Sequence, residues 1–275
     1  MPQYGGGVLK KKFVKYVVQD LTSGGIDWQR EKWKSGFGSK YIRQGEKNAV
    51  KYADEVIVLS KGVQEYFKET YGRETHFIPN GVNRPEIRGA ELIAKKFGLE
   101  KDSYILFLGR LVPEKGIRYL VEAFKSVKTD KKLVIAGGSS DTDSFMEELK
   151  ELAKDDDRIL FTGFVQGQLL DELYSNAYLY TLPSVLEGMP LSLLEAMSYG
   201  NCCLVSDIPE CAEVVEDKAL IFKKSNVEDL QEKLQDACDH PDIVMKMKKQ
   251  AADFICKKYN WDEVVKETMK LYRRK

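Results

Sequence analysis

The sequence predicts an α/β protein built around a doubly wound, parallel β-sheet, and three observations support this. From about residue 54, short apolar runs alternate with amphipathic helical patterns. The runs are continuously apolar, as expected of parallel strands that are covered on both faces. Strand and helix patterns alternate at the spacing of βαβ units. Ligands of such sheets bind beyond the carboxyl ends of the strands, so the residues that follow each run are the candidates for chemistry.

The elements follow from these patterns in chain order. The runs expected to form strands are Val56–Leu59, Tyr104–Leu108, Leu133–Ala136, Ile159–Phe161, Ala177–Leu182, Cys202–Val205 and Ala219–Phe222. The stretches expected to form helices between them are Ile117–Val127, Ser144–Lys154, Leu169–Ser175, Leu191–Tyr199 and Val227–Cys238. Another helix is expected from about Ser39 to Tyr52, and two more within Pro241–Lys275.

Composition limits the class of protein. Of the 275 residues, 43% are hydrophobic and 31% are charged, which suits a packed core and a soluble surface. Lys plus Arg equals Asp plus Glu at 43 each, so the net charge indicates no nucleic acid partner, while peripheral membrane association through a local basic patch stays open. No segment approaches the roughly 20 apolar residues of a transmembrane helix, and no signal-peptide pattern is visible. Because Cys202 and Cys203 lie in an apolar run, we expect buried thiols and a cytoplasmic protein.

The strongest candidate site follows the predicted strand Ala177–Leu182. Pro190 suits the first position of the next helix, whose free amides can face a phosphate or sugar oxygen. Glu187 in the loop and Glu195 in the helix can accept hydrogen bonds from hydroxyls at different parts of one extended ligand. The alternative is an ordinary loop-to-helix junction with two solvated glutamates. The residues expected to bind a ligand here are Glu187, Gly188, Met189, Pro190, Leu191 and Glu195.

A second candidate site follows the predicted strand Tyr104–Leu108. Gly109 allows a ligand to approach the backbone closely. Arg110 and Lys115 place two cations beside a helix start, where they can stabilise the negative charge that develops on a leaving diphosphate without a metal. The alternative is a solvated loop with ordinary surface charges.

Other strand ends carry weaker signals. Gly138 follows Leu133–Ala136 and could lie near a nucleotide, although plain turn chemistry explains it equally well. Phe164 and Val165 follow the next run and could line a base pocket.

Several common motifs are missing from the sequence. It has no P-loop, no GxGxxG at a strand end and no GxSxG around Ser184. His76 and His240 lack the spacing of metal ligands. We therefore expect no bound metal and no cofactor.

Four segments occur in the order found in the retaining nucleotide-sugar glycosyltransferases of the GT-B type, called family 4, and residues 50–275 resemble that family. The segments are Ala53–Ser60, Ile78–Val82, Gly109–Gly116 and Glu187–Glu195. The resemblance implies two Rossmann-like domains facing a cleft, with a C-terminal helix that crosses back to the first domain. It also implies that Arg110 and Lys115 bind the donor diphosphate, that Glu187 contacts the donor sugar and that Glu195 holds the ribose hydroxyls. Arg110, Lys115 and Glu187 are therefore the expected catalytic residues.

The first part of the chain departs from the family pattern. Tyr4–Gly7 resembles the glycine-rich loop of the N-terminal domain, and Gly24–Arg30 resembles a later segment in which Gly24 takes the place of a histidine. Much of what separates these segments in a full member is absent. We expect a shortened, incomplete N-terminal α/β domain on the acceptor side at 1–83, a nucleotide-sugar-binding domain at 84–253 and the crossing helix at 254–275.

The sequence favours an enzyme that moves a sugar from a nucleotide-diphospho-sugar to a saccharide or another hydroxyl acceptor, with retention of configuration. A truncated nucleotide-sugar-binding module without turnover is the first alternative. A nucleotide-sugar epimerase of the same architecture is the second, and the two poorly placed histidines count against it. The nucleotide, the sugar, the acceptor and the oligomeric state lie in features that the sequence does not specify.

Overall fold

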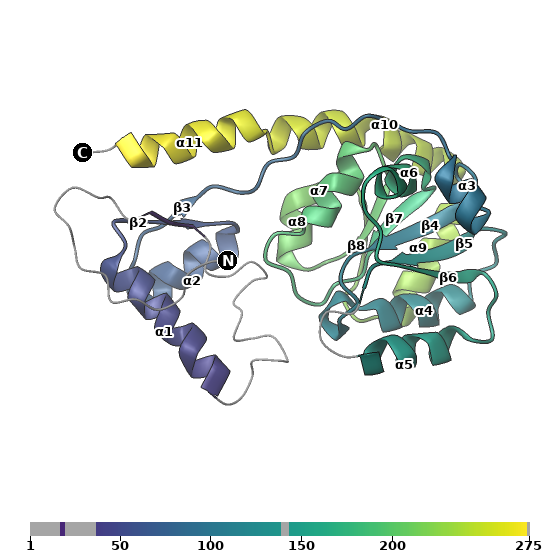
Figure 1. The fold of residues 1–275 in the computed structure, drawn as a ribbon, viewed down its shortest axis with the longest axis horizontal. Coiled ribbons are helices and arrows are strands. Elements are labelled where there is room, and N and C mark those ends of the chain that lie inside the picture. The colour runs from purple at the N-terminus through teal and green to yellow at the C-terminus, as the bar shows by residue number, and fades with distance from the viewer. Residues whose placement is uncertain (1–16, 20–36, 139–142, 274–275) are drawn as a thin grey trace. The chain divides into compact units, whose positions relative to one another are not determined.

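The computed structural model describes residues 17–19, 37–138 and 143–273 (Figure 1). The chain forms two compact units, one made of Met1–Asn80 with Asp262–Lys275 and the other of Gly81–Trp261. The functional boundaries expected at residues 83 and 253 stay predictions. The glycine-rich Tyr4–Gly7 loop and the Gly24–Arg30 segment lie outside the described residues.

The first unit contains a parallel sheet of order β1-β2-β3. Side chains alternate across its central strand, so the two faces pack against different helices. Val56 packs with Phe67 of α2, whereas Ile57 packs with Val264 and Leu271 of α11. The elements are β1 (Val17–Gln19), α1 (Phe37–Tyr52), β2 (Glu55–Val58), α2 (Lys61–Tyr71), β3 (His76–Phe77) and α11 (Trp261–Arg273).

The second unit is a parallel, six-stranded sheet of order β6-β5-β4-β7-β8-β9. Numbered within the unit, this is the order 3-2-1-4-5-6 of a doubly wound Rossmann sheet, which confirms the predicted fold class. All six strands had been expected from their apolar runs, and each lies within two residues of its expected ends. They are β4 (Tyr104–Leu108), β5 (Lys132–Ala136), β6 (Ile159–Gly163), β7 (Leu179–Leu182), β8 (Cys203–Ser206) and β9 (Leu220–Phe222).

Helices cover both faces of this sheet (Figure 1). On one face α4 packs against α5 and α9, and on the other α6 packs against α3 and α7 against α10. None of the described helices is both long and apolar enough to cross a membrane. The helices are α3 (Leu92–Phe97), α4 (Ile117–Lys125), α5 (Asp143–Ala153), α6 (Gln168–Asn176), α7 (Leu191–Ser198), α8 (Pro209–Val215), α9 (Val227–Asp239) and α10 (Pro241–Lys258), with a short 3-10 turn, η3 (Pro113–Lys115).

The helices α2, α3 and α8 were not predicted, and α3 shows why. Its first amides are capped by a carboxylate from α6, because Glu172 Oε2 accepts hydrogen bonds from the N–H groups of Glu91, Leu92 and Ile93 at 2.7 to 3.0 Å. Burial acts to raise the pKa of Glu172, but these backbone donors and Gln168 bring it below its ordinary value. A cap from about eighty residues away leaves no local signal in the sequence.

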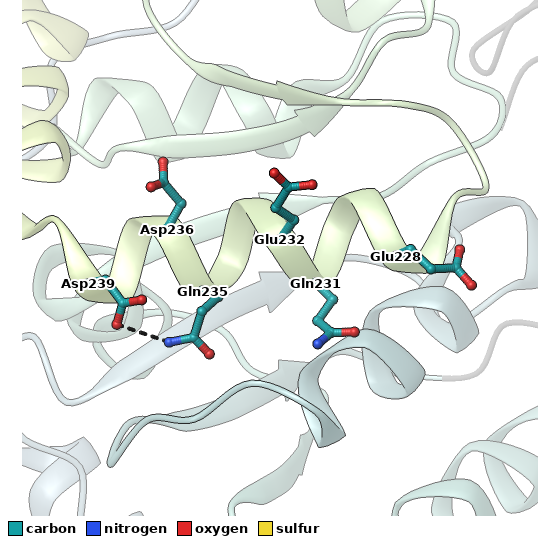
Figure 2. A pocket seen from close by; sticks show the side chains of 6 residues that line it. All are labelled: Glu228, Gln231, Glu232, Gln235, Asp236 and Asp239. Carbon is teal, nitrogen blue, oxygen red and sulfur yellow. Dashed lines mark hydrogen bonds between the residues drawn. The ribbon is translucent and has the colours of Figure 1, made fainter.

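The helix α9 packs one side against the sheet and turns a polar side outward (Figure 2). Leu230, Leu234 and Ala237 form the buried side. The outward side borders a shallow depression lined by Glu228, Gln231, Glu232, Gln235, Asp236 and Asp239.

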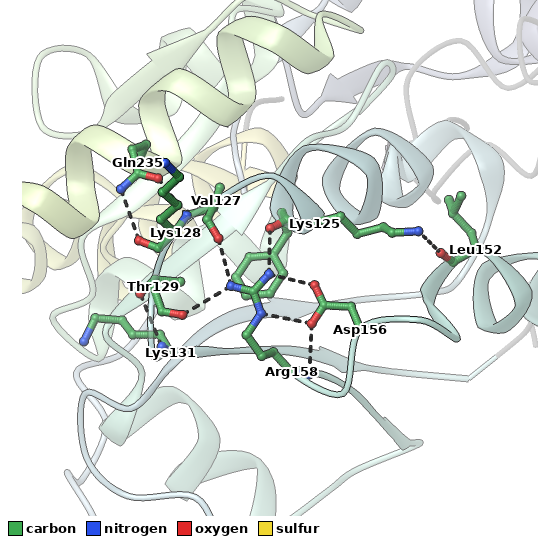
Figure 3. A network of polar contacts seen from close by, with 10 residues as sticks. Lys125, Val127, Lys128, Thr129, Lys131, Leu152, Asp156, Arg158 and Gln235 are labelled. Atoms are coloured by element: carbon green, nitrogen blue, oxygen red, sulfur yellow. Dashed lines mark hydrogen bonds and ion pairs between the residues drawn. The ribbon is translucent and has the colours of Figure 1, made fainter.

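An arginine network ties α4 to the edge strand β6 at the amino end of the sheet (Figure 3). The Arg158 guanidinium contacts both carboxylate oxygens of Asp156 at 2.7 and 2.9 Å. It also donates to the carbonyl oxygens of Val127 and Thr129, at 2.8 and 3.2 Å. The hydrogen bonds from Arg158 to the carboxylate lower the pKa of Asp156 below its ordinary value. The network fixes the end of the sheet that lies opposite the candidate site.

At the carboxyl end of the sheet, the loops after four strands are joined by backbone contacts. Gly109 N–H donates to Ala136 O at 3.0 Å, and Gly137 N–H donates to Gly163 O at 2.9 Å. Gly116 has φ 68°, and a β-carbon there would fall on the carbonyl oxygen of Pro183. The loops after β4 and β7 therefore touch at a position where only glycine fits.

We expect Gly116→Ala to destabilise the protein more than Gly98→Ala. Both glycines have a left-handed backbone, but no atom lies within 4 Å of a β-carbon built at Gly98. The left-handed conformation alone should cost Gly98→Ala about 1–2 kcal/mol. Denaturant unfolding measures both losses. Equal losses would mean that the contact with Pro183 is easily relieved.

We expect Arg158→Met to lower the free energy of unfolding by about 1–3 kcal/mol, because it leaves backbone carbonyls and a carboxylate without their donor. A carboxyl whose pKa is lowered by folding stabilises the protein above its unfolded pKa, and that stabilisation is lost as the pH falls through the folded value. The variant should therefore lose less stability than the wild type on acidification below about pH 4.

The matched control for this variant is Arg118→Met, which removes an exposed ion pair with Glu148 and should change stability little. Denaturant unfolding at several pH values measures both variants. A parallel pH dependence of wild type and Arg158→Met would contradict the role given to the network.

Candidate functional site

The candidate site lies where the strand order of the second unit reverses. The strands β4 and β7 are neighbours, yet the chain leaves them toward opposite edges of the sheet. The loops after such a pair diverge and leave a crevice, which is where ligands of doubly wound sheets bind. Gly109–Gly116 follows β4 and Pro183–Pro190 follows β7, so both motifs singled out in the sequence meet at this reversal point.

An ion pair joins the two loops. Lys115 Nζ lies 2.5 Å from Glu187 Oε1, and both side chains are largely buried, at 14% and 6% exposure. Ser184 Oγ donates to the same carboxylate oxygen at 2.6 Å. The backbone adds a second tie, since Val185 N–H donates to Glu114 O at 2.9 Å. The cation and the carboxylate, 72 residues apart in the chain, thus form one unit.

Arg110 is placed differently from Lys115. It is exposed, at the start of the same loop. Its guanidinium is thus accessible to a ligand that approaches from solvent. The two cations expected to bind a diphosphate thus differ in their surroundings. Lys115 is held in a buried ion pair, and Arg110 is exposed to solvent.

The loops after β5 and β6 border the β4 loop. Leu111 N–H donates to Gly138 O at 3.1 Å, and a β-carbon on Gly138 would lie 3.8 Å from Phe164 Cβ. Phe164 is 74% exposed, whereas Val165 is buried. An exposed aromatic ring beside a glycine offers a flat surface for a planar group. These three residues had been expected near the nucleotide, and that role stays a prediction.

The helix α7 begins at Leu191, so Pro190 is its N-cap residue and not, as had been expected, its first helical residue. Gly188, Met189 and Pro190 are buried in the turn that precedes it, and Leu191 is 48% exposed. The three buried residues shape the backbone of the turn, while the side chain of Leu191 stays accessible.

Glu195 lies in a cavity of about 400 Å³ between α6, α7 and the segment after Gly81. Leu191 and Tyr174 also line this cavity, whereas Arg110, Lys115 and Glu187 do not. Tyr180 joins the end of β4 to the helix that carries Glu195. Tyr180 O–H lies 3.3 Å from Leu108 O at the end of β4 and 2.9 Å from Ser192 Oγ in α7.

The environment of Glu195 disfavours its charge. By accessible surface the residue is exposed, but the protein around its carboxyl group raises its pKa, and a hydrogen bond from Tyr174 offsets part of that rise. A carboxylate in such surroundings gains from hydroxyl donors that replace the missing water.

Sequence reasoning missed several polar groups of this region. Ser184 was considered only as a nucleophile and instead orients Glu187. Tyr174 and Tyr180 appeared only as members of apolar patterns. Glu210, at the start of α8, has its pKa raised by burial and by the charge of Glu187. These residues have no motif, because packing brings their polar atoms to the site.

The acidic depression on α9 is a poor alternative site. Carboxylates and amides from one helix line it, so it would repel a diphosphate. Within the described ranges, no group of three or more His, Cys, Asp or Glu side chains is arranged to hold a metal ion.

Solved structures share the fold. Sucrose-phosphate synthase from Thermosynechococcus elongatus superposes with a TM-score of 0.80 at 24% identity, covering 94% of this chain and 67% of that one. The Anabaena protein HepE, in complex with UDP and glucose, superposes with a TM-score of 0.81 at 16% identity, covering 93% and 71%.

Curated relatives cover most of this chain. An uncharacterized glycosyltransferase of Methanocaldococcus jannaschii is 30% identical over 253 residues, which is 86% of this chain and 64% of the relative. Alpha-maltose-1-phosphate synthase of Mycolicibacterium smegmatis is 25% identical over 271 residues, 90% of this chain and 69% of the relative. The chain thus spans about two thirds of the length of these relatives.

Family models account for both parts of the chain. Residues 11–83 match a domain of unknown function, DUF1972. Residues 90–272, which contain the sheet reversal and both motif loops, match the model for glycosyl transferases group 1. The chain therefore belongs to the group 1 glycosyl transferase family.

Proposed function

We propose that this chain binds a nucleotide-diphospho-sugar and transfers the sugar, with retention, to a hydroxyl of a saccharide or another acceptor. It would do so in the cytoplasm and without a metal or a bound cofactor. Free cysteines, three of them fully buried, support a reducing compartment. The complex of HepE with UDP and glucose supports a nucleotide sugar as the donor.

One observation carries the proposal, which is the buried Lys115–Glu187 pair at the reversal point of the sheet. A lysine held there is positioned for an anionic group at the start of α4, and a carboxylate beside it can accept hydrogen bonds from sugar hydroxyls. Arg110 adds an exposed cation on the same loop. This combination suits a ligand that is anionic at one end and rich in hydroxyls at the other.

The reaction would need no nucleophile from the protein. The acceptor oxygen forms a bond to the anomeric carbon while the bond from that carbon to the diphosphate oxygen breaks on the same face. The acceptor proton passes to the departing nucleoside diphosphate. Arg110 and Lys115 would stabilise the charge that develops on this leaving group, and Glu187 would hold the sugar in place.

We expect Arg110→Ala and Lys115→Ala each to weaken the binding of a nucleotide sugar by about 1–3 kcal/mol, the scale of a lost charged hydrogen bond. Calorimetry with UDP-glucose, GDP-mannose and ADP-glucose would measure this. Arg110 is exposed, so its loss should leave the melting temperature unchanged. Lys115→Ala should also lower the melting temperature, because it leaves Glu187 unpaired.

Lys95→Ala, which removes an exposed lysine of α3, is the control for a general effect of charge on binding. Unchanged affinity in both site variants would remove the assignment of the diphosphate site. Transfer of labelled sugar by the purified chain would support the enzyme, and nucleotide binding without transfer or donor hydrolysis would favour a binding module.

A further inference from the structure

A buried tyrosine contacts the carboxylate of Glu195. Tyr174, in α6, is 1% exposed, and its hydroxyl oxygen lies 3.1 Å from Glu195 Oε2 and 3.3 Å from the carbonyl oxygen of Ser192. The hydroxyl has one proton, and the shorter contact leads to a charged acceptor, which makes the stronger hydrogen bond. Tyr174 therefore donates to Glu195.

This hydrogen bond involves one oxygen of the Glu195 carboxylate, Oε2, and leaves the other oxygen, Oε1, available. In the part of the chain that the structure describes, Oε1 of Glu195 has no hydrogen-bond partner, and the residue lines the 400 Å³ cavity together with Tyr174. The Tyr174 hydroxyl keeps its proton at all physiological pH values, because burial raises its pKa well above the ordinary value. The donor is thus permanent, and one carboxylate oxygen stays available to accept from a hydroxyl.

The tyrosine itself is held rigidly. Its ring stacks on Tyr199 with centroids 5.1 Å apart, and it packs at 6.0 Å against Tyr180. Tyr199 O–H is held in turn by Asp171 Oδ1 at 2.7 Å. Tyr174, Tyr180 and Tyr199 each interact electrostatically with Glu195, and Asp171 lines the same cavity.

We propose that Tyr174 is a positioning residue, which holds Glu195 in the rotamer that directs its free oxygen to the hydroxyls of the donor nucleotide. This rests on the proposed function and on the role that the resemblance to the retaining glycosyltransferases implies for Glu195, which is to hold the ribose hydroxyls. Without the hydroxyl of Tyr174, the carboxylate of a partly exposed helical glutamate can turn toward solvent, and its rotamer must be fixed when the ligand binds. Removal of the Tyr174 hydroxyl should therefore weaken ligand binding, and it should do so through its effect on Glu195.

The test compares two tyrosine-to-phenylalanine variants of the full chain. Tyr174→Phe removes the donor to Glu195 and keeps the ring. Tyr178→Phe is the matched control, because that buried hydroxyl donates to the carbonyl oxygen of Ala237, at 2.6 Å, away from the site. The probes are UDP, GDP and ADP, with affinity measured by calorimetry. We expect Tyr174→Phe to weaken the nucleotide that the wild type binds best by roughly threefold to tenfold, and Tyr178→Phe to leave its affinity unchanged.

A double-mutant cycle separates positioning from general destabilisation. If Tyr174 acts through Glu195, Tyr174→Phe should cause no further loss of affinity once Glu195→Ala is present. Wild-type affinity in Tyr174→Phe, or losses that multiply in the double variant, would overturn the proposal.

A second measurement needs no ligand. The carboxyl carbon of Glu195, assigned by its disappearance in Glu195→Ala, can be titrated by ¹³C NMR. Loss of the donor should move its titration midpoint to higher pH in Tyr174→Phe and not in Tyr178→Phe. An unmoved midpoint would refute the hydrogen bond and with it the positioning role. If the wild type bound none of the three nucleotides, the proposed function would fail, while this titration would still decide whether Tyr174 holds Glu195.

Discussion

The contact between the loops after β4 and β7 determines the geometry of the candidate site. These loops meet because their strands are neighbours at the reversal of the sheet order, and Gly116 lets the backbone of one loop touch Pro183 of the other. The Lys115–Glu187 pair forms across this contact, within a region where both side chains lose most of their water. A buried charge without its partner would be costly, so the sheet topology and the pairing of charges support each other.

The site divides its polar groups between two kinds of surroundings. Lys115 and Glu187 are fixed by each other and by Ser184, whereas Arg110 is free to move in solvent. Glu195 lies between these extremes, at the edge of a cavity, with one carboxylate oxygen held by a tyrosine. Such a combination would suit the extended ligand proposed for this site, whose central part would meet prearranged groups and whose ends would meet more accessible side chains.

Support for the site comes from the opposite end of the sheet and from distant caps. Arg158 binds carbonyls that follow α4, and Glu172 caps the first turn of α3. Neither residue belongs to the loops at the reversal point, yet both hold elements whose positions fix the strands.

The sequence by itself determined the strands of the second unit and the loops that were proposed to carry its chemistry. Continuous apolar runs such as Tyr104–Leu108 leave no other place for a buried parallel strand, and the glycine, cation and carboxylate motifs follow directly after them. It did not indicate α3, whose cap comes from Glu172, or the roles of Ser184 and Tyr174, whose polar atoms act on residues brought near by folding. Only the tertiary structure decided which charges pair and which carboxylate oxygen stays available. The reason is physical. A hydrophobic pattern depends only on the order of the residues along the chain, whereas a hydrogen bond between side chains depends on distances that exist only after the strands have been ordered.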